Sequence, residues 1–309
     1  MLDVKRLRVL HEVAKQGSFS AAADALSYTQ SAISQQIAAL ERETATTLVE
    51  RGARGIRLTD AGEALVRHAD AILMRITDAE AELEAIAGLR GGRVRLACFT
   101  TAGSTFVPHA IATFHERHPA VDISLREADP EESVPGLKAG HLDIAILFEP
   151  HGAGDLTDLE QTHLLEDPMS IVLPEKHPLA SRAKIRLKDL ESEAWVQTTD
   201  SCPCCVIVAD RCRAAGFEPR IAFESDDYLT IQGLVAAGVG VAMIPSLGLA
   251  AVRPDIAIRP VTGTPPKRDI FAATLPGGRK SPATQAMLEV LEEAAAQYYQ
   301  GETRLSVAS

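Results

Sequence analysis

Four of the five cysteines in this 309-residue chain lie close together, and thiols are its most reactive side chains. The run Cys202-Pro203-Cys204-Cys205 is predicted to open a helix, where the pKa of a thiol is lowered and its reactivity is raised. Oxidation, metal binding and simple packing between a helix and a sheet remain alternative interpretations. A C-x-C-C cluster on one helical turn is not a usual zinc spacing. The candidate redox residues are Cys202, Cys204, Cys205 and Cys212.

The sequence contains no recognisable catalytic motif. G-x-S-x-G, the glycine-rich phosphate loop and H-E-x-x-H are all missing from it. His115 and His118 are spaced i and i+3, but no third metal ligand is nearby in the sequence, so we interpret both as solvent-facing. We therefore expect a protein that is not an enzyme and that needs neither a cofactor nor a metal.

Contact with DNA bases is a different chemistry, and it is indicated between Ser18 and Asp60. Two short helices joined at residues 27–29 and followed by a two-stranded ribbon are predicted, which is the layout of a winged helix-turn-helix. In the second helix, apolar residues from Ile33 to Leu40 recur at helical spacing. Its other face carries short polar side chains where a recognition helix meets base edges, although an ordinary amphipathic helix pair is the alternative. The candidate DNA-binding residues here are Thr29, Gln30, Ser31, Ser34 and Gln35.

The predicted ribbon is rich in arginine. Its strands, Leu48 to Arg51 and Gly55 to Leu58, suit contact with phosphates and the minor groove, and a solvated basic turn is the alternative. The whole chain carries a net charge of −11, yet residues 1–58 hold eight Lys/Arg and six Asp/Glu. Attraction for phosphates must therefore come from a local patch. The candidate residues are Arg51, Arg54 and Arg57.

A long helix is predicted to begin at Thr59-Asp60 and to run to about Ala87. Its apolar residues follow a heptad pattern, which is typical of a two-stranded coiled coil. Packing of this seam against the chain's own body is the alternative. The seam consists of Leu65, Ile72, Ile76, Leu83 and Ile86.

Beyond the glycine-rich boundary at residues 88–92, short strands alternate with helices. This rhythm predicts open, largely parallel sheets, in two units that begin near Val94 and Met169. The chain has no run of about 18 apolar residues, so we expect no membrane span. The N-terminus lacks the apolar run of a signal peptide, which predicts a cytoplasmic protein.

The run from Arg6 to Gly62 resembles the N-terminal domain of the LysR-type transcriptional regulators. Residues 139–146 and 238–245 resemble the effector domain of that family, so the resemblance covers nearly the whole chain. Ser31 stands where proline is more usual. The N-terminal positions that match in order and spacing are Leu7, Phe19, Ala22, Ala23, Leu26, Gln30, Ser31, Ala32, Ile33, Ser34, Ile37, Leu40, Glu41, Leu48, Arg51, Leu58, Thr59, Ala61 and Gly62.

The resemblance implies an α+β protein whose C-terminal part is a two-lobed α/β domain similar to periplasmic solute-binding proteins. Its partners would be double-stranded DNA at a promoter or operator, a small-molecule effector, and further copies in a homodimer or homotetramer. No membrane partner is implied. The expected domains are a winged helix-turn-helix at 1–58, a linker (dimerisation) helix at 59–88 and an effector-binding domain at 91–309, with lobe I at about 91–163 and 268–300 and lobe II at about 164–267.

Three loops lie beyond the predicted carboxyl ends of strands, where ligands of open α/β sheets bind. The resemblance implies that these loops face the cleft between the lobes. Hydroxyls and free helix N-terminal donors in the loops suit a small anion, although ordinary helix caps are the alternative. The candidate effector-binding residues are Thr100, Thr101, Ala102, Ser104, Thr198, Thr199, Asp200, Cys202, Asp226 and Tyr228.

The resemblance also suggests a redox role for the cysteines. Peroxide-sensing members of the family carry a redox pair in this region, and Cys212 falls near the second cysteine of that pair. The first cysteine is not matched position for position. The alternative function is therefore a thiol-based redox-sensing transcriptional regulator that uses the Cys202–Cys212 cluster.

Overall fold

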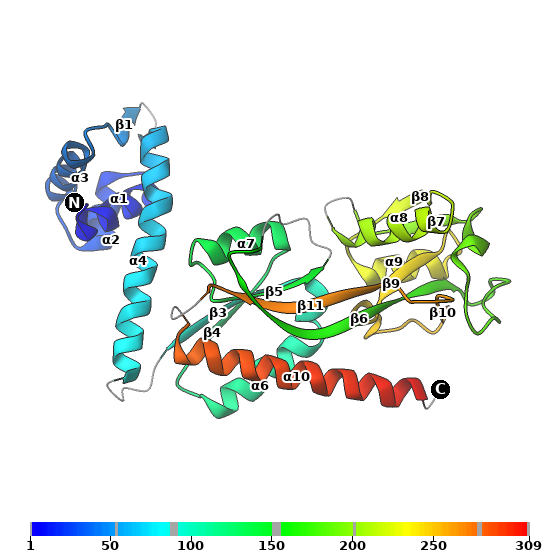
Figure 1. Ribbon diagram of the computed structural model, residues 1–309. Helices are drawn as coiled ribbons and strands as arrows, with labels where there is room; N and C mark the ends of the chain where they lie inside the picture. The colour runs from blue at the N-terminus through cyan, green and yellow to red at the C-terminus, as the bar shows by residue number, and fades with distance from the viewer. Residues whose placement is uncertain are drawn as a thin grey trace. The chain divides into compact units, whose positions relative to one another are not determined.

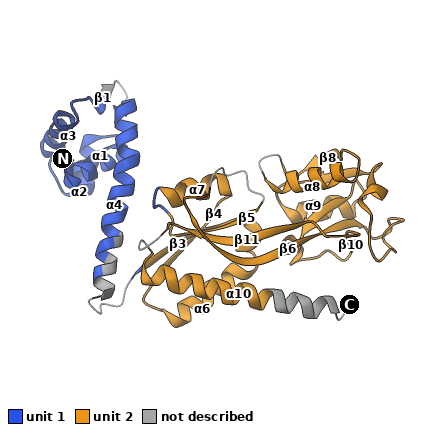
Figure 2. Ribbon diagram, viewed as in Figure 1, with its two compact units in different colours: residues 1–92, 139–141 blue, residues 93–138, 142–309 orange. Residues whose placement is uncertain are grey.

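The computed structural model describes residues 2–52, 55–86, 92–149, 156–199, 202–276 and 280–307. These residues form two compact units, residues 1–92 with 139–141 and residues 93–138 with 142–309 (Figure 2). Each unit has its own hydrophobic core. Among the residues described, no helix combines the length and the apolar run that crossing a bilayer requires.

The core of the first unit is helical, and local signals set where its helices begin and end. Gly17 ends the first helix in the left-handed conformation, with φ at 62°. The Thr29 hydroxyl accepts a hydrogen bond from the backbone N–H of Ala32 at 3.2 Å, which confirms the predicted cap. The helices are α1 (Val4–Gln16), α2 (Phe19–Leu26) and α3 (Gln30–Thr44) (Figure 1).

A two-stranded wing follows, in which β1 (Val49–Gly52) and β2 (Gly55–Leu58) pair antiparallel. Glu41 on α3 accepts hydrogen bonds from the backbone N–H groups of Leu48 and Val49 at 2.8 and 3.2 Å. These bonds satisfy two donors at the start of the wing and fasten the wing to α3.

The long helix α4 (Asp60–Ile86) begins where the sequence predicts. The Thr59 hydroxyl caps it by accepting from the Gly62 N–H at 3.1 Å. The first turns of α4 pack on the core of the first unit. Further along, the side chains of Ile72 and Leu83 are 36% and 66% exposed, so part of the heptad seam is uncovered in a single chain.

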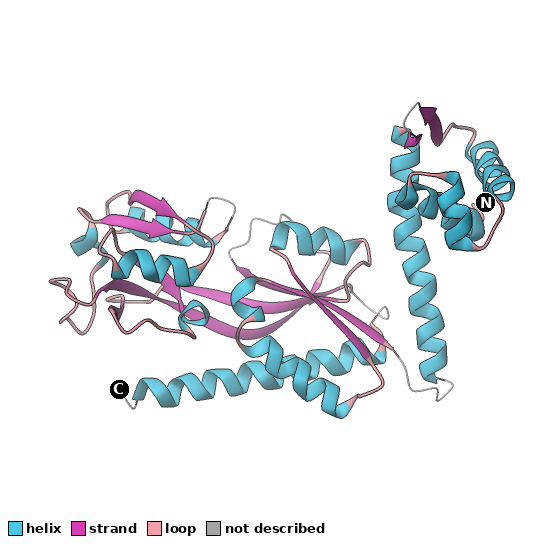
Figure 3. Cartoon of the chain, turned by 180° about the vertical axis from the view of Figure 1, so that it is seen from behind, coloured by secondary structure: helices cyan, strands magenta, loops and turns pink. Residues whose placement is uncertain are grey.

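One part of the second unit, here called lobe I, is built on three strands, with β3 lying parallel to both neighbours. Helices α6 and α10 cover one face of the sheet and α7 covers the other (Figures 1 and 3). Its elements are β3 (Arg93–Cys98), α5 (Thr100–Gly103), α6 (Phe106–Arg117), β4 (Asp122–Glu127), α7 (Pro130–Lys138), β5 (Ile144–Glu149) and α10 (Pro282–Val307).

Two long strands, β6 (Glu160–Pro174) and β11 (Lys267–Thr274), connect lobe I to the rest of the unit. β11 pairs antiparallel with both β5 and β6, so the sheet is mixed. The predicted largely parallel arrangement is therefore wrong for the connecting strands. The chain leaves lobe I along β6 and returns to it along β11, so these two neighbouring strands run in opposite directions.

Lobe II is built on the far half of β6. Its core encloses Trp195, which is fully buried and is the only tryptophan in the chain. The sequence analysis missed β10 and the short helix α5. The elements of lobe II are η1 (Leu187–Leu190), β7 (Ala194–Gln197), α8 (Cys204–Ala214), β8 (Arg220–Glu224), α9 (Tyr228–Ala236), β9 (Ala242–Pro245), η2 (Ser246–Leu249) and β10 (Ile256–Pro260).

The first turn of α4 leaves no room for a side chain at Gly62. A Cβ there would lie 2.1 Å from the backbone oxygen of Leu48. We predict that Gly62→Ala lowers the free energy of unfolding by about 1–3 kcal/mol, because backbone must move to relieve the overlap. Thermal unfolding of the full-length protein followed by circular dichroism measures this.

Gly233→Ala is the matched control. Gly233 lies within α9, and a Cβ there meets nothing within 4 Å. Alanine should therefore be neutral or should stabilise by up to about 1 kcal/mol through helix propensity. Equal behaviour of the two variants would contradict the steric argument.

Candidate functional site

The N-terminal end of α3 presents an uncovered polar face. Gln30, Ser31 and Gln35 are exposed and Ser34 is half-buried, whereas the apolar stripe of the same helix is fully inside. The Thr29 hydroxyl is already engaged as the helix cap, and it lies 3.0 Å from the Ser31 hydroxyl. Of the predicted base-reading residues, Thr29 therefore has a clear structural role, and the side chains of the other four are exposed or half-buried.

The wing shows only part of its predicted basic patch. Arg57 on β2 is exposed. Arg51 lies on β1, but its side chain is outside the described part, as is the whole of Arg54. The antiparallel register pairs Arg57 with Glu50. The predicted phosphate contacts of these three arginines therefore stay predictions.

In the second unit, a buried arginine joins several elements where the two lobes meet. Arg268 on β11 is 2% exposed, and its Nε and one terminal nitrogen donate to the carboxylate of Asp167 on β6, which is fully buried. The same guanidinium donates to the Thr101 hydroxyl of lobe I at 3.1 Å. The other Asp167 oxygen accepts from the Leu247 N–H of lobe II at 3.0 Å. One ion pair thus holds β6, β11 and both lobes together.

The aromatic surroundings of this pair exclude water from it. The Arg268 guanidinium carbon lies 5.1 Å from the ring centre of Phe99 and 4.8 Å from that of Phe148. Rings at this distance attract a cation through their electron-rich faces. The charge of Arg268 is therefore neutralised by Asp167, and it is not a free anion-binding group.

Two thiols complete the cluster. Arg268 donates to the sulfur of Cys204 at 3.4 Å, and Cys202 is hydrogen-bonded to the same sulfur. The bond from Cys202 and the charge of Arg268 lower the pKa of the Cys204 thiol to about 6. The same bond raises the pKa of Cys202 above its ordinary value. The Tyr228 hydroxyl is buried beside Cys204.

The remaining cysteines behave differently from that pair. Cys98 and Cys212 are buried in apolar cores, where burial raises the pKa of each thiol to about 12. A thiol held protonated by burial is a poor nucleophile, so the prediction that Cys212 takes part in redox chemistry is not supported by its surroundings.

Several of the predicted effector-binding residues are held by the protein's own carboxylates. The Thr100 hydroxyl donates to Glu127 at 2.8 Å. The backbone N–H and hydroxyl of Thr199 both donate to Asp226, at 2.9 and 2.8 Å. Ser104 donates to the backbone oxygen of Thr101 at 3.2 Å. The hydroxyls that the sequence analysis offered to a ligand are thus largely engaged.

The remaining predicted effector-binding residues differ in how far they are buried. Ala102 is fully buried in the core of lobe I, which contradicts contact between its side chain and an effector. Thr198 is 4% exposed and interacts with the Cys202 thiol. Cys202 is half-buried. Asp200 lies outside the described residues.

Carboxylates also occupy the places where the sequence analysis expected an anion. Asp227 caps α9 by accepting from the Leu229 and Thr230 N–H groups at 3.0 and 3.3 Å, so these N-terminal donors are satisfied. Burial, with the nearby charges of Glu131 and Asp226, raises the pKa of Asp129. The anionic effector stays a prediction, and these carboxylates are the charged groups that such a ligand would meet here.

Arg268, Asp167 and Glu127 were not predicted as site residues. Asp167 follows Glu166 on β6, and Arg268 stands between Lys267 and Asp269 on β11, so neighbouring charges conceal both residues in the sequence. Nothing in the sequence pairs them either, since they are 101 positions apart.

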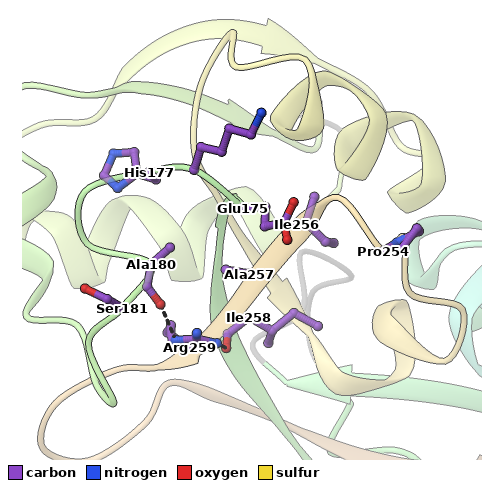
Figure 4. A pocket seen from close by; sticks show the side chains of 10 residues that line it. Glu175, His177, Ala180, Ser181, Pro254, Ile256, Ala257, Ile258 and Arg259 are labelled. Carbon is purple, nitrogen blue, oxygen red and sulfur yellow. Dashed lines mark hydrogen bonds between the residues drawn. The ribbon is translucent and has the colours of Figure 1, made fainter.

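A separate open pocket of about 500 Å³ lies on lobe II beside β10 (Figure 4). Arg259 at its edge donates to the backbone oxygen of Ala180 at 2.8 Å. His177 Nδ1 accepts from the Leu179 N–H at 3.1 Å, and its Nε2 faces Glu193 at 3.3 Å. None of the predicted effector-binding residues lines this pocket.

Comparison with known proteins places the chain in a family. The profile of the LysR substrate binding domain matches residues 87–296, and that of the bacterial regulatory helix-turn-helix protein, lysR family, matches residues 4–63. The chain belongs to the LysR family of transcriptional regulators. Known relatives of this LysR protein are regulators and not enzymes.

Two curated relatives span most of the chain. The probable regulator LrrA of Synechococcus elongatus is 30% identical over 302 residues, which cover 95% of this chain and 98% of LrrA. The dual regulator GltC of Bacillus subtilis is 31% identical, with 84% of this chain and 85% of GltC covered. Among solved structures, full-length CbnR complexed with its target DNA shares the fold with a TM-score of 0.69 and 24% identity, covering 95% of this LysR protein and all of CbnR.

The buried pair makes a quantitative prediction. Arg268→Met should lower the free energy of unfolding by about 3–5 kcal/mol, because it leaves the Asp167 carboxylate buried without a counter-charge. Adding Asp167→Leu should recover much of the loss. Urea unfolding followed by the fluorescence of Trp195, the only tryptophan, reports on this unit.

Arg253→Met is the matched control. Arg253 pairs with Asp255 at the surface, where both side chains are about 45% exposed. An exposed pair contributes less than about 1 kcal/mol, so this variant should unfold almost as the wild type does. If Arg268→Met and Arg253→Met lower the free energy of unfolding by similar amounts, the buried pair contributes no more to stability than the exposed pair does.

Proposed function

We propose that this regulator reads operator DNA through the exposed polar face of α3. The observation that carries the proposal is that Gln30, Ser31 and Gln35 are exposed at the N-terminal end of α3, the end that a helix-turn-helix inserts into the major groove. Side-chain amides and hydroxyls can bond to base edges there. The serine at position 31 gives this surface one more hydroxyl than proline would.

The wing supplies the sequence-independent part of the binding. Arg57 is exposed, and Arg51 and Arg54 lie in the same hairpin of the sequence. A local cluster of guanidinium groups can bind phosphates although the whole chain is acidic, because screening confines the attraction to about 10 Å.

The seam of α4 supports a dimer or a tetramer. Ile72 and Leu83 are exposed large apolar residues on a heptad pattern, and a partner helix would cover them. Two copies would present two recognition helices to two half-sites. CbnR has been solved in complex with its target DNA, which is consistent with this use of the shared fold. The protein would act in the cytoplasm, where its DNA target lies.

The second unit would bind a small effector where lobes I and II meet. Thr101, Thr198, Cys202 and Tyr228 are brought to this junction around the fixed pair of Arg268 and Asp167. The carboxylates of Glu127, Asp129 and Asp226 lie nearby. A neutral or positively charged effector suits these surroundings better than an anion does, since like charges repel. Closure of the lobes on such a molecule would shift the protein between two states that differ in DNA binding. The size of this shift depends on how much more tightly the effector binds one state than the other.

The DNA assignment predicts two different defects. Gln30→Ala should remove a contact with a base edge, so the preference for operator over random DNA should fall by about 1–3 kcal/mol. Arg57→Ala should weaken binding to both DNAs about equally and should reduce the salt slope by about one unit. Fluorescence anisotropy at several salt concentrations measures both.

Arg126→Ala controls for the loss of one positive charge, because Arg126 is exposed on the second unit. It should bind both DNAs as the wild type does. Operator preference that survives Gln30→Ala, Ser34→Ala and Gln35→Ala combined would refute the assignment of α3.

The charge of the effector can be tested directly. Calorimetry of the full-length protein with a panel of amines, neutral metabolites and carboxylates should find binding among the first two groups. Asp226→Asn should weaken an amine ligand about tenfold, whereas Asp122→Asn on the exposed strand β4 should leave the affinity unchanged. Tight binding of a carboxylate that is indifferent to Asp226 would show that this account of the junction is wrong.

A further inference from the structure

In the pocket beside β10, no carboxylate of the described residues pairs with Arg259. Its Nε donates to the backbone oxygen of Ala180 at 2.8 Å, and one terminal nitrogen donates to that of Ile258 at 2.7 Å. Both acceptors are carbonyls, so they fix the direction of the guanidinium without cancelling its charge. Arg268 and Arg253, by contrast, each pair with a carboxylate. Arg259 is therefore a positive charge that is held in place while its second terminal nitrogen can still donate.

The rest of the lining suits a molecule with one polar end and an apolar body (Figure 4). Lys176 and Ser181 are exposed, and neither side chain has a polar partner among the residues that the structure describes. Ile256 and Ala180 are buried and add apolar surface to the lining. The volume of about 500 Å³ is far larger than an inorganic ion and lies in the range of small-molecule sites.

The chain around the pocket is basic although the protein as a whole is acidic. Residues 176–188 hold five Lys/Arg and no Asp/Glu, whereas the whole chain has a net charge of −11. Glu175 is the one carboxylate of the lining, against the two bases Lys176 and Arg259. The lining therefore has an excess of positive charge, which attracts an anion and repels a cation at short range.

We propose that this pocket is a second ligand site, separate from the junction of the lobes, and that it binds a small phosphate monoester. A phosphate monoester carries a charge of about −1.5 to −2 at neutral pH and three acceptor oxygens. These oxygens accept from Arg259 and Lys176, with the Ser181 hydroxyl as a further donor. The carbon part of the ligand lies against Ile256. Because carbonyls already hold Arg259, binding does not have to order that side chain.

The test is calorimetry of the full-length protein with three probes in a buffer of low chloride. Glycerol phosphate presents the dianion with a carbon body, inorganic phosphate presents the head group alone, and dimethyl phosphate has the same shape with a single charge. Glycerol phosphate should bind most tightly. Equal affinities for the three probes would contradict the proposal, as would no binding of glycerol phosphate at up to about 10 mM, where the free energy of binding is already small.

Variants of the two bases test the placement of the phosphate. Arg259→Met should weaken the binding of glycerol phosphate about tenfold or more, because a charge-assisted hydrogen bond is lost. Lys176→Met should weaken it several-fold, and this variant decides the matter if Arg259→Met does not fold. Lys184→Met is the matched control, since Lys184 is exposed in the same basic segment but does not line the pocket. Equal losses in Lys184→Met and Lys176→Met would reduce the effect to general charge attraction and overturn the site.

Two further variants separate this pocket from the junction and fix the charge of the ligand. Glu175→Gln should tighten the binding of glycerol phosphate several-fold, because it removes the one negative charge of the lining. Weaker binding to this variant would contradict the proposed contact. Asp226→Asn at the junction should leave the affinity unchanged. A probe that loses affinity in Asp226→Asn and not in Arg259→Met is bound at the junction, and this result would refute the second site.

Discussion

The buried ion pair between Arg268 and Asp167 is the constraint around which the second unit is arranged. A charge in an apolar core is costly unless a counter-charge and hydrogen bonds accompany it. Each polar atom of this pair is therefore a point at which neighbouring elements are fixed: Thr101 from lobe I, Leu247 from lobe II, and the two connecting strands themselves. Such a pair is weak evidence for stability, but its hydrogen bonds tie the elements it joins to one another.

The same pair determines what the neighbouring side chains can do chemically. Asp167 pairs with Arg268, and the same guanidinium donates to the Cys204 sulfur. The hydroxyls and N–H groups around the junction are satisfied by Glu127, Asp226 and Asp227. The polar groups of the junction are thus held in place by the chain's own carboxylates.

The function of the first unit depends on the side chains that its fold leaves exposed. The apolar stripe of α3 is buried in the core of the first unit, and the polar face of the same helix stays exposed. The wing is tied to α3 through Glu41, so the arginine-bearing strands and the recognition helix move as one body. Beyond the first turns of α4, Ile72 and Leu83 of the seam are exposed.

The sequence by itself determined the features that arise from neighbours in the chain. The cap at Thr29, the cap at Thr59 and the stop at Gly17 each depend on residues within a few positions, and the helical spacing of Ile33 to Leu40 follows from one repeat length. The family resemblance rests on the same local patterns. For this reason the winged helix-turn-helix and most strands and helices of the lobes could be predicted.

Only the tertiary structure decided which distant groups meet. The residues around Arg268 in the sequence do not indicate that Asp167 is its partner. The residues around Thr100 likewise do not indicate that its hydroxyl donates to Glu127. The direction of β11 was missed for the same reason, because it depends on where the returning strand lies. The four clustered cysteines look alike in the sequence, and they became different when folding placed Cys204 beside a guanidinium and Cys212 in an apolar core. Burial and charge act through space, so the chemistry of these residues was fixed by the fold and not by their spacing.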